Sequence, residues 1–299
     1  MTTFTPTSSS HASSRGRFSV PSARYYSPAA SLGLAAPLVA VLMAGFLYPV
    51  MRLVVLSFSG GTFDHYRRIF AEPLHLGVLL STIEIAFMVT IASLILGFPI
   101  AYLMTRLSKR LAMVVAACVF IPLWTSVLIR SYAWVVLLQR NGIINELLLE
   151  LGVTERPLKL IYTHGAVILA MTHVLMPFMI LPIYSALCAL PHDYIRAARN
   201  LGAGPVRAFI SVTLPLSLPG IFAGGVMCFV LALGFYITPA LVGGPGSMLM
   251  ATLIGQQTTV LLDWPFAAAL STVLLAVTLL FILLFRRTLS LSKGLNSVY

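Results

Sequence analysis

Two ionisable side chains lie inside otherwise apolar stretches, where a charge is costly and usually has a partner or a function. Glu84 lies near the start of the apolar stretch 77–105, and Arg130 lies near the end of the stretch 111–138. Because a helix rises about 1.5 Å per residue, both charges are expected about 10–12 Å below the same membrane surface. The sequence therefore predicts a Glu84–Arg130 ion pair, which a solute could share, or two side chains that reach the lipid headgroups independently.

Aromatic side chains occur close to these charges along the chain. Aromatic faces attract cations by about 0.5–2 kcal/mol per contact, so they would suit a solute with ammonium groups. Carboxylates such as Glu84 or Asp263 would suit the same solute, whereas the aromatic residues could instead form the belt found at membrane surfaces. The candidate residues of a solute path are Glu84, Trp124, Arg130, Tyr132, Trp134, Tyr236, Thr238 and Asp263.

Glycine and proline interrupt one apolar stretch at Gly234–Pro239. This pattern weakens a helix and frees backbone carbonyls, which membranes tolerate where the backbone is buried in protein or lines a cavity. We expect part of a gate or of the solute path there. Gly220 and Gly224, four residues apart, could let two helices pack closely.

The composition indicates the kind of structure that must position these residues. Of 299 residues, 59% are hydrophobic and only 9% are charged. A transmembrane helix needs about 20 apolar residues. The stretches that meet this length are 31–57, 77–105, 111–138, 165–188, 217–242 and 266–285. The sequence thus predicts an all-α membrane protein with six transmembrane helices.

Positive charge gathers in alternate connections between these stretches. The cations are Arg15, Arg17, Arg24, Arg106, Lys109, Arg110, Arg196, Arg199, Arg207, Arg286, Arg287 and Lys293. By the positive-inside rule, both termini and these connections are cytoplasmic, so the net charge of +11 does not require nucleic acid. We expect a disordered basic tail at 1–30, a six-span domain at 31–290 with a cytoplasmic loop at 189–216, and a cytoplasmic tail at 291–299.

The loop 189–216 has the residues of two short helices joined by a glycine. Asp193 can cap the first helix, Gly202 suits the left-handed position after its last turn, and Pro205 suits the first turn of the second helix. Pro215 and Pro219 are expected to interrupt the backbone before apolar sequence resumes. A compact helix pair in a cytoplasmic loop indicates a surface for a partner protein.

This loop resembles the one that defines the membrane subunits of ATP-binding-cassette (ABC) importers. The pattern is Glu-Ala-Ala, three residues, Gly, nine residues and Ile-x-Leu-Pro. The matching positions are Ala197, Ala198, Gly202, Val212 (for Ile), Leu214 and Pro215, whereas Arg196 stands where the pattern has Glu. Much of the remaining chain resembles the spermidine/putrescine-type branch. The phrases that carry this resemblance are 96–102, 122–126, 130–134, 140–142, 234–239 and 263–265.

The resemblance implies a type I ABC importer permease with the MetI-like fold in a bacterial inner membrane. Such a subunit forms half of the path for a small solute, here a polyamine or, alternatively, an amino acid derivative, a metal or an organic anion. The implied partners are an ABC ATPase dimer, a second homologous permease and an extracytoplasmic solute-binding protein. The residues implied to couple to the ATPase are Asp193, Tyr194, Arg196, Ala197, Ala198, Arg199, Gly202 and Pro215.

The sequence lacks the motifs that would indicate an enzyme. The sequence has no Walker loop, so ATP–Mg is expected on the partner ATPase and no cofactor is expected in this chain. It has neither His-Glu-x-x-His nor Gly-x-Ser-x-Gly, and its three cysteines lack metal-type spacing. A secondary transporter remains the other alternative, although no convincing internal repeat supports it. His173 is expected to be a packed or hydrogen-bonded core residue rather than a ligand.

Overall fold

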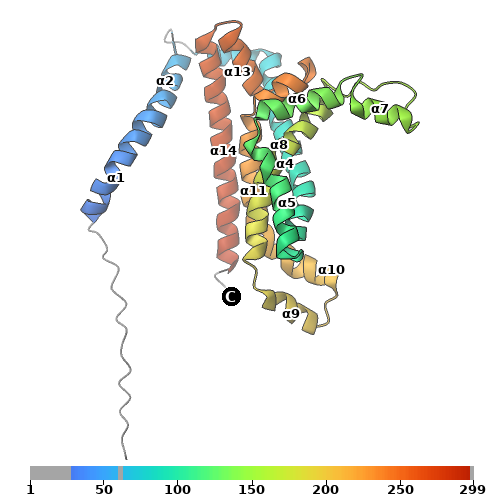
Figure 1. Cartoon of the computed structure of the whole chain (residues 1–299). Helices are drawn as coiled ribbons and strands as arrows, with labels where there is room; N and C mark the ends of the chain where they lie inside the picture. Colours follow the sequence, from blue (N-terminus) through green and yellow to red (C-terminus); the bar gives the residue numbers. More distant parts are fainter. Residues whose placement is uncertain (1–27, 60–62, 297–299) are drawn as a thin grey trace, which may run out of the picture. The chain divides into compact units, whose positions relative to one another are not determined.

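The computed structural model describes residues 28–59 and 63–296, and this part of the chain contains helices and connections but no strand (Figure 1). Nearly all of the predicted tail 1–30, and the end of the predicted tail 291–299, lie outside the described residues. The chain divides into one unit that ends at Met51 and another that begins at Arg52.

The first helical run follows the apolar stretch predicted at 31–57. It contains α1 (Pro28–Leu42), a π-turn η1 (Met43–Leu47) and α2 (Tyr48–Ser57). Its segment Gly33–Ser57 is long and apolar enough to cross a membrane. The prediction of a helical span here is therefore confirmed.

The second unit is built on three long helices that pack together: α4 (Pro73–Arg106), α8 (His164–Cys188) and α11 (Leu214–Leu233). The residues of α8 at the centre of this packing are fully or almost fully buried. They are Met171, Leu175, Met179, Ile180 and Ile183. Another long helix, α14 (Trp264–Asn296), contacts α11. The apolar stretches 77–105, 165–188 and 266–285 thus form helices as predicted.

Two glycines allow α11 to lie unusually close to α8. A Cβ atom at Gly220 would lie 2.6 Å from the carbonyl oxygen of Pro182 and 2.6 Å from Cβ of Ala186. One at Gly224 would lie 3.0 Å from the carbonyl oxygen of Met179. The two separations at Gly220 are shorter than a real Cβ atom shows, and the one at Gly224 is tighter than most Cβ contacts, so the close packing expected from the two glycines is confirmed.

The third predicted span is not one straight helix. α5 (Lys109–Trp124) ends two residues before α6 (Val127–Leu138), and the helical segment that starts at Val127 is bent by 101° from α5. Pro122, in the last turn of α5, has no N–H to donate to the carbonyl of Cys118, which weakens the end of this helix. The side chain of Ser126 then accepts a hydrogen bond from the backbone N–H of Leu128 and caps the new helix.

The fifth predicted span begins earlier than its apolar stretch. α10 (Pro205–Ala208), a π-turn η2 (Phe209–Thr213) and α11 form one helical run, Pro205–Leu233. The prediction that Pro215 and Pro219 would interrupt the backbone is therefore wrong. Pro215 directly follows the π-turn η2, where the regular hydrogen-bond pattern is already interrupted, and Pro219 is accommodated inside α11. The run ends at Leu233, before α12 (Ile237–Val242), as Gly234 and Pro239 indicated.

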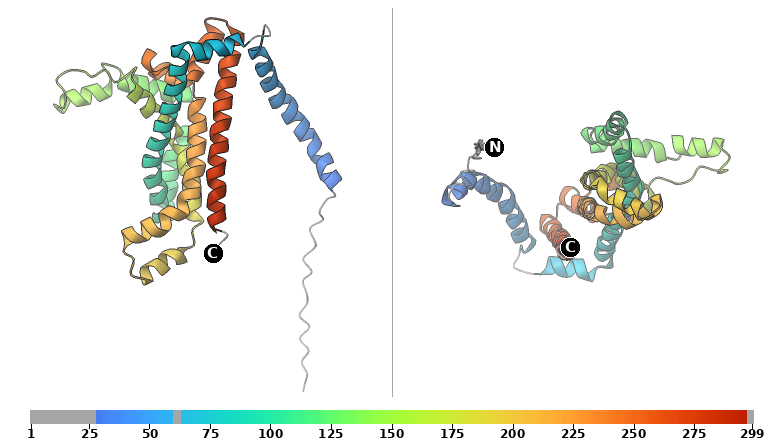
Figure 2. Two further views of the ribbon diagram at one scale, coloured as in Figure 1. Left: turned by 180° about the vertical axis from the view of Figure 1, so that it is seen from behind. Right: turned by 90° about the horizontal axis from the view of Figure 1, so that it is seen from below.

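Short helices occupy the two ends of this unit (Figures 1 and 2). At one end lie α3 (Asp64–Ala71), the 3₁₀ turn η3 (Pro245–Ser247) and α13 (Met250–Thr259). α9 (His192–Asn200) and α10 lie at the opposite end. α7 (Ile143–Glu150) follows α6.

Candidate functional site

The loop helix α9 begins one residue earlier than its predicted cap. Its N-cap is Pro191, and no side chain caps it, so the prediction that Asp193 caps this helix is wrong. Asp193 lies instead in the first turn, where its carboxylate is 3.7 Å from the guanidinium of Arg196. Both side chains are exposed, and a pair of this kind contributes little to stability.

Gly202 ends α9 in the conformation expected from the sequence. Its φ is +82°, in the left-handed region where a side chain is strained. The Gly202 N–H donates to the carbonyl of Arg199 (2.9 Å), and the Ala203 N–H donates to that of Ala198 (3.0 Å). Pro205 then occupies the first turn of α10. The reversal between the two helices therefore depends on Gly202.

α9 presents most of its surface to the surroundings. Tyr194, Arg196, Ala197 and Arg199 are exposed, and Ala198 is half-buried. None of the described side chains of α9 is buried. Arg196 and Arg199, three residues apart, share one face of the helix. Pro215, the last of the predicted coupling residues, is also exposed.

The second candidate region lies where the two broken spans meet. α6 follows the break at 125–126 and α12 follows the break at 234–236, and the two helices contact each other. The hydroxyls of Ser131 and Thr238 form a buried hydrogen bond of 2.7 Å between them. Thr238 was predicted from the sequence, whereas Ser131 was missed because a serine in an apolar stretch carries little signal of its own.

Arg130 is buried next to this contact, and only 9% of its surface is exposed. Its Nε and Nη1 atoms are buried without a hydrogen-bond partner among the described residues. Glu84, on α4, is exposed, and no ion pair joins it to Arg130 in this part of the chain. The predicted pair assumed a straight third span, whereas the bend before α6 gives this helix a different direction.

Aromatic residues of the predicted path lie on α5 and α6 and near the break before α12. Trp124, at the end of α5, is 92% exposed, and Tyr132 is exposed on α6. The indole N–H of Trp134 donates to Nδ1 of His173 on α8 at 3.3 Å. His173 is hydrogen-bonded as expected, but it is exposed rather than packed in the core, and it was not predicted as a path residue.

Tyr236 lies in the break before α12 and packs on α13. A Cβ atom at Gly255 would lie 2.5 Å from the Tyr236 ring, so the ring occupies the space that a side chain there would need. Tyr236 is nevertheless 46% exposed. This contact joins the end of α11 to the helix that precedes α14.

Asp263 lies in a different cluster from Arg130. Its carboxylate accepts a hydrogen bond from the backbone N–H of Phe266 (3.2 Å) and lies 3.5 Å from the guanidinium of Arg68 on α3. Asp263 therefore binds the start of α14 and α3, and it is not brought together with Ser131 and Thr238. Within the described residues, no group of His, Cys, Asp and Glu side chains has the arrangement of a metal site.

Residues 93–287 match the family described as the binding-protein-dependent transport system inner membrane component, and the chain belongs to that family. It is therefore a multi-pass membrane protein and a permease subunit of an ABC importer, in which the enzymatic step belongs to a separate ATPase.

Curated relatives and solved structures agree with this assignment. The chain is 36% identical over 238 residues to the spermidine/putrescine transport system permease protein PotB of Salmonella typhimurium, covering 79% of this chain and 83% of the relative. It is also 36% identical over 226 residues to PotB of Escherichia coli, covering 76% and 82%. A bacterial ABC transporter for alginate import has the same fold, with a TM-score of 0.68, 20% identity and coverage of 87% and 94%.

Proposed function

We propose that this chain forms half of the path through which an ABC importer carries a polyamine such as spermidine or putrescine into the cell. The relatives named PotB support the solute class, since the similarity extends over most of both chains. A second homologous permease supplies the other half of the path. An extracytoplasmic binding protein delivers the solute to the end of the bundle that carries α3 and α13.

α9 is the element that receives the ATPase. Its exposed, charged surface carries this proposal, because a nine-residue helix with no buried side chain among its described residues gains little stability from contacts with its own chain. Seated in a groove of an ATPase that binds ATP–Mg, α9 would gain the contacts that it lacks here. Closure of the ATPase dimer would then move α9 and, with it, the spans. Both termini and α9 lie in the cytoplasm in this arrangement, as the distribution of positive charge favours.

The solute path follows the two broken spans. Backbone breaks at membrane depth are tolerated where they line a cavity or are buried in protein, and both breaks precede helices that contact each other. Trp124, Tyr132, Trp134, His173 and Tyr236 would supply polar and aromatic surface to the path. Of the predicted carboxylates, Glu84 is available to a cation, whereas Asp263 is bound to Arg68.

One observation favours a second solute class. Arg130 is buried without a carboxylate partner among the described residues, and a buried guanidinium of this kind suits a carboxylate of a solute better than an ammonium group. An organic anion or an amino acid derivative is therefore the alternative cargo. A polyamine would approach Arg130 only if another group neutralised its charge.

Uptake by the complete importer tests both classes. The chain would be reconstituted in proteoliposomes with its ATPase, sister permease and binding protein, and uptake of labelled spermidine would be measured with ATP inside. We expect ATP-dependent uptake that unlabelled putrescine inhibits and glutamate does not. Absence of spermidine uptake together with ATP-dependent uptake of labelled glutamate would replace the polyamine by the anionic class.

A further inference from the structure

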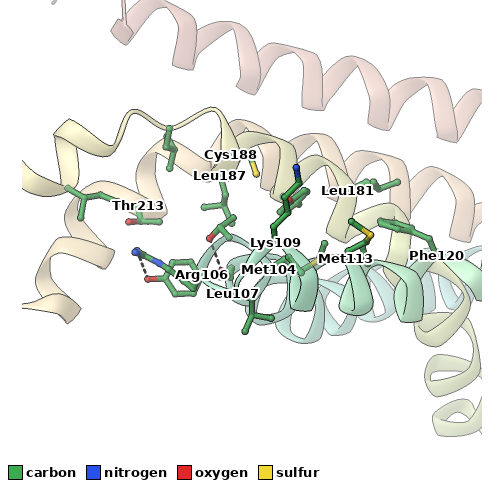
Figure 3. A pocket seen from close by; sticks show the side chains of 17 residues that line it. Met104, Arg106, Leu107, Lys109, Met113, Phe120, Leu181, Leu187, Cys188 and Thr213 are labelled. Atoms are coloured by element: carbon green, nitrogen blue, oxygen red, sulfur yellow. Dashed lines mark hydrogen bonds between the residues drawn. The ribbon is translucent and has the colours of Figure 1, made fainter.

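A groove runs between α5 and the C-terminal half of α8, at the end of the bundle that carries α9 (Figure 3). It encloses about 570 Å³. One face of α5 lines it from Lys109 through Met113 to Phe120. At about 1.5 Å per residue, this face extends for about 16 Å along the helix. The groove is therefore long and narrow rather than round.

Its two ends differ in chemistry. Figure 3 shows Arg106 toward one end and Phe120 and Leu181 at the other, with Lys109 between them. The wall between them is apolar and includes Met104, Met113 and Leu187. An occupant that fills the groove must therefore combine a polar head with an apolar chain.

The polar end is positively charged. Nη2 of Arg106 donates to the Tyr102 hydroxyl at 2.9 Å, and its guanidinium lies 5.0 Å from the centre of the Tyr102 ring, so the side chain is held in place. Lys109 lies in the first turn of α5, where backbone N–H groups add to the positive potential. No carboxylate lines the groove, and neither cation forms an ion pair within the described part of the chain.

This charge excludes the proposed cargo and favours an anion. A polyamine would be repelled by Arg106 and Lys109, so the groove is no part of its path. A small soluble anion would satisfy the cations but leave the apolar length empty. An anionic phospholipid satisfies both ends, and the Lys/Arg pair lies next to the connection at 107–108 between two apolar helices, where headgroups are expected.

We propose that this groove binds one anionic phospholipid, with its phosphate at Arg106 and Lys109 and an acyl chain along Met113 and Phe120. Ile195 of α9 also lines the groove. The lipid therefore touches the helix assigned to the ATPase contact, although the binding site itself does not depend on that assignment or on the identity of the cargo.

The test uses the complete importer complex in nanodiscs that contain equal amounts of phosphatidylglycerol and phosphatidylethanolamine. After transfer to detergent, native mass spectrometry measures which lipid remains bound. We expect phosphatidylglycerol to be retained, and Arg106→Gln with Lys109→Gln to lower its retention roughly tenfold or more, because both phosphate contacts are lost. The matched control Arg156→Gln with Lys159→Gln changes two exposed cations outside the groove and should retain the lipid.

A second pair of variants tests the shape of the groove without changing its charge. Ala116→Phe projects into the groove and should expel the lipid, whereas Ala117→Phe lies on the exposed side of α5 and should not. Both are compared only in complexes that assemble with the ATPase. Equal retention of the two lipids by the unaltered complex would overturn the proposal. So would unchanged retention in the Arg106/Lys109 variant, or displacement of the lipid by millimolar glycerol phosphate, which has no acyl chain.

Discussion

The helices α3 and α9 have nearly the same length, at 8 and 9 residues, and both are amphipathic and charged, yet they differ in how their own chain covers them. α3 buries Ile69 completely, whereas no described side chain of α9 is buried. Two similar local sequences therefore lead to different tertiary outcomes. The comparison indicates that α3 completes the fold, and it supports the proposed role of α9 as a helix that binds a partner.

The polar contacts of the two helices repeat this difference. Arg68 on α3 lies 3.3 Å from Glu72 and 3.5 Å from Asp263, and its guanidinium is 4.2 Å from the ring centre of Phe266, so it joins α3 to the start of α14. Among the carboxylates of the described residues, Arg196 on α9 reaches only Asp193, on the same helix. An arginine that bridges elements stabilises the fold more than one whose only carboxylate partner lies on its own helix.

The largest effect is expected at the buried position of α3. Ile69→Ala should destabilise the folded subunit by about 2–5 kcal/mol, because it removes buried methyl groups and leaves a cavity. Ile195→Ala on α9 should cost less, since Ile195 is half-buried. Thermal unfolding of both variants in nanodiscs measures the difference. Equal losses would mean that α9 contributes to the fold as much as α3 does.

Gly202→Val should affect coupling rather than folding. A β-branched residue at φ +82° is strained by about 1–3 kcal/mol, so α9 would change its direction relative to α10. We expect ATP hydrolysis stimulated by the binding protein to fall about tenfold while membrane insertion is normal. Gly204→Val is the matched control, because Gly204 has φ −64° and open space around its Cβ position. Normal stimulation in the Gly202 variant would contradict a coupling role for α9.

Arg68→Ala should have a smaller effect on stability. The side chain is about half exposed, so its two ion pairs and its contact with Phe266 together contribute about 1 kcal/mol after screening by solvent. The midpoint of thermal unfolding should fall, and it should fall less at high salt than at low salt. A midpoint that does not move would show that the contacts of Arg68 add nothing measurable to the apolar packing of α3.

The smallest effect on stability is expected for Arg196→Ala. Its pair with Asp193 is exposed on both sides and spans 3.7 Å, so its loss should change the free energy of unfolding by no more than about 0.5 kcal/mol. ATPase activity in the full complex should nevertheless change, because Arg196 lies on the proposed contact surface. A loss of stability as large as that of Arg68→Ala would remove the distinction between the two helices.

Local backbone rules predicted the end of α9 well. Gly202 and Pro205 have conformational preferences that hold in any surroundings, and the structure places both as expected. The bend before α6 was not predicted, because hydropathy measures how apolar a stretch is and not its direction. Pro122 and Ser126 carried the signal for this bend in the sequence.

The sequence did not show which residues far apart in the chain contact each other. Asp263 was predicted for the solute path, yet its cation is Arg68, which lies 195 residues earlier in the chain. Glu84 and Arg130 were paired by depth alone, and depth does not reveal which way a side chain faces. By contrast, Gly220 and Gly224 predicted a close helix contact correctly, since that contact needs only small residues on one face.

The close contact between α8 and α11 determines how far a displacement of α9 is transmitted through the bundle. Because α11 has no side chain at Gly220 and Gly224, its backbone lies close to that of α8 at these two positions, and little can deform between the helices there. α9 lies between α8 and α11 in the chain, so both of its ends are connected to one rigid pair of helices. A displacement of a few ångströms at the proposed ATPase contact would therefore be transmitted along both helices to the opposite membrane surface. Bulkier residues at Gly220 and Gly224 would separate the two helices and reduce the displacement that is transmitted.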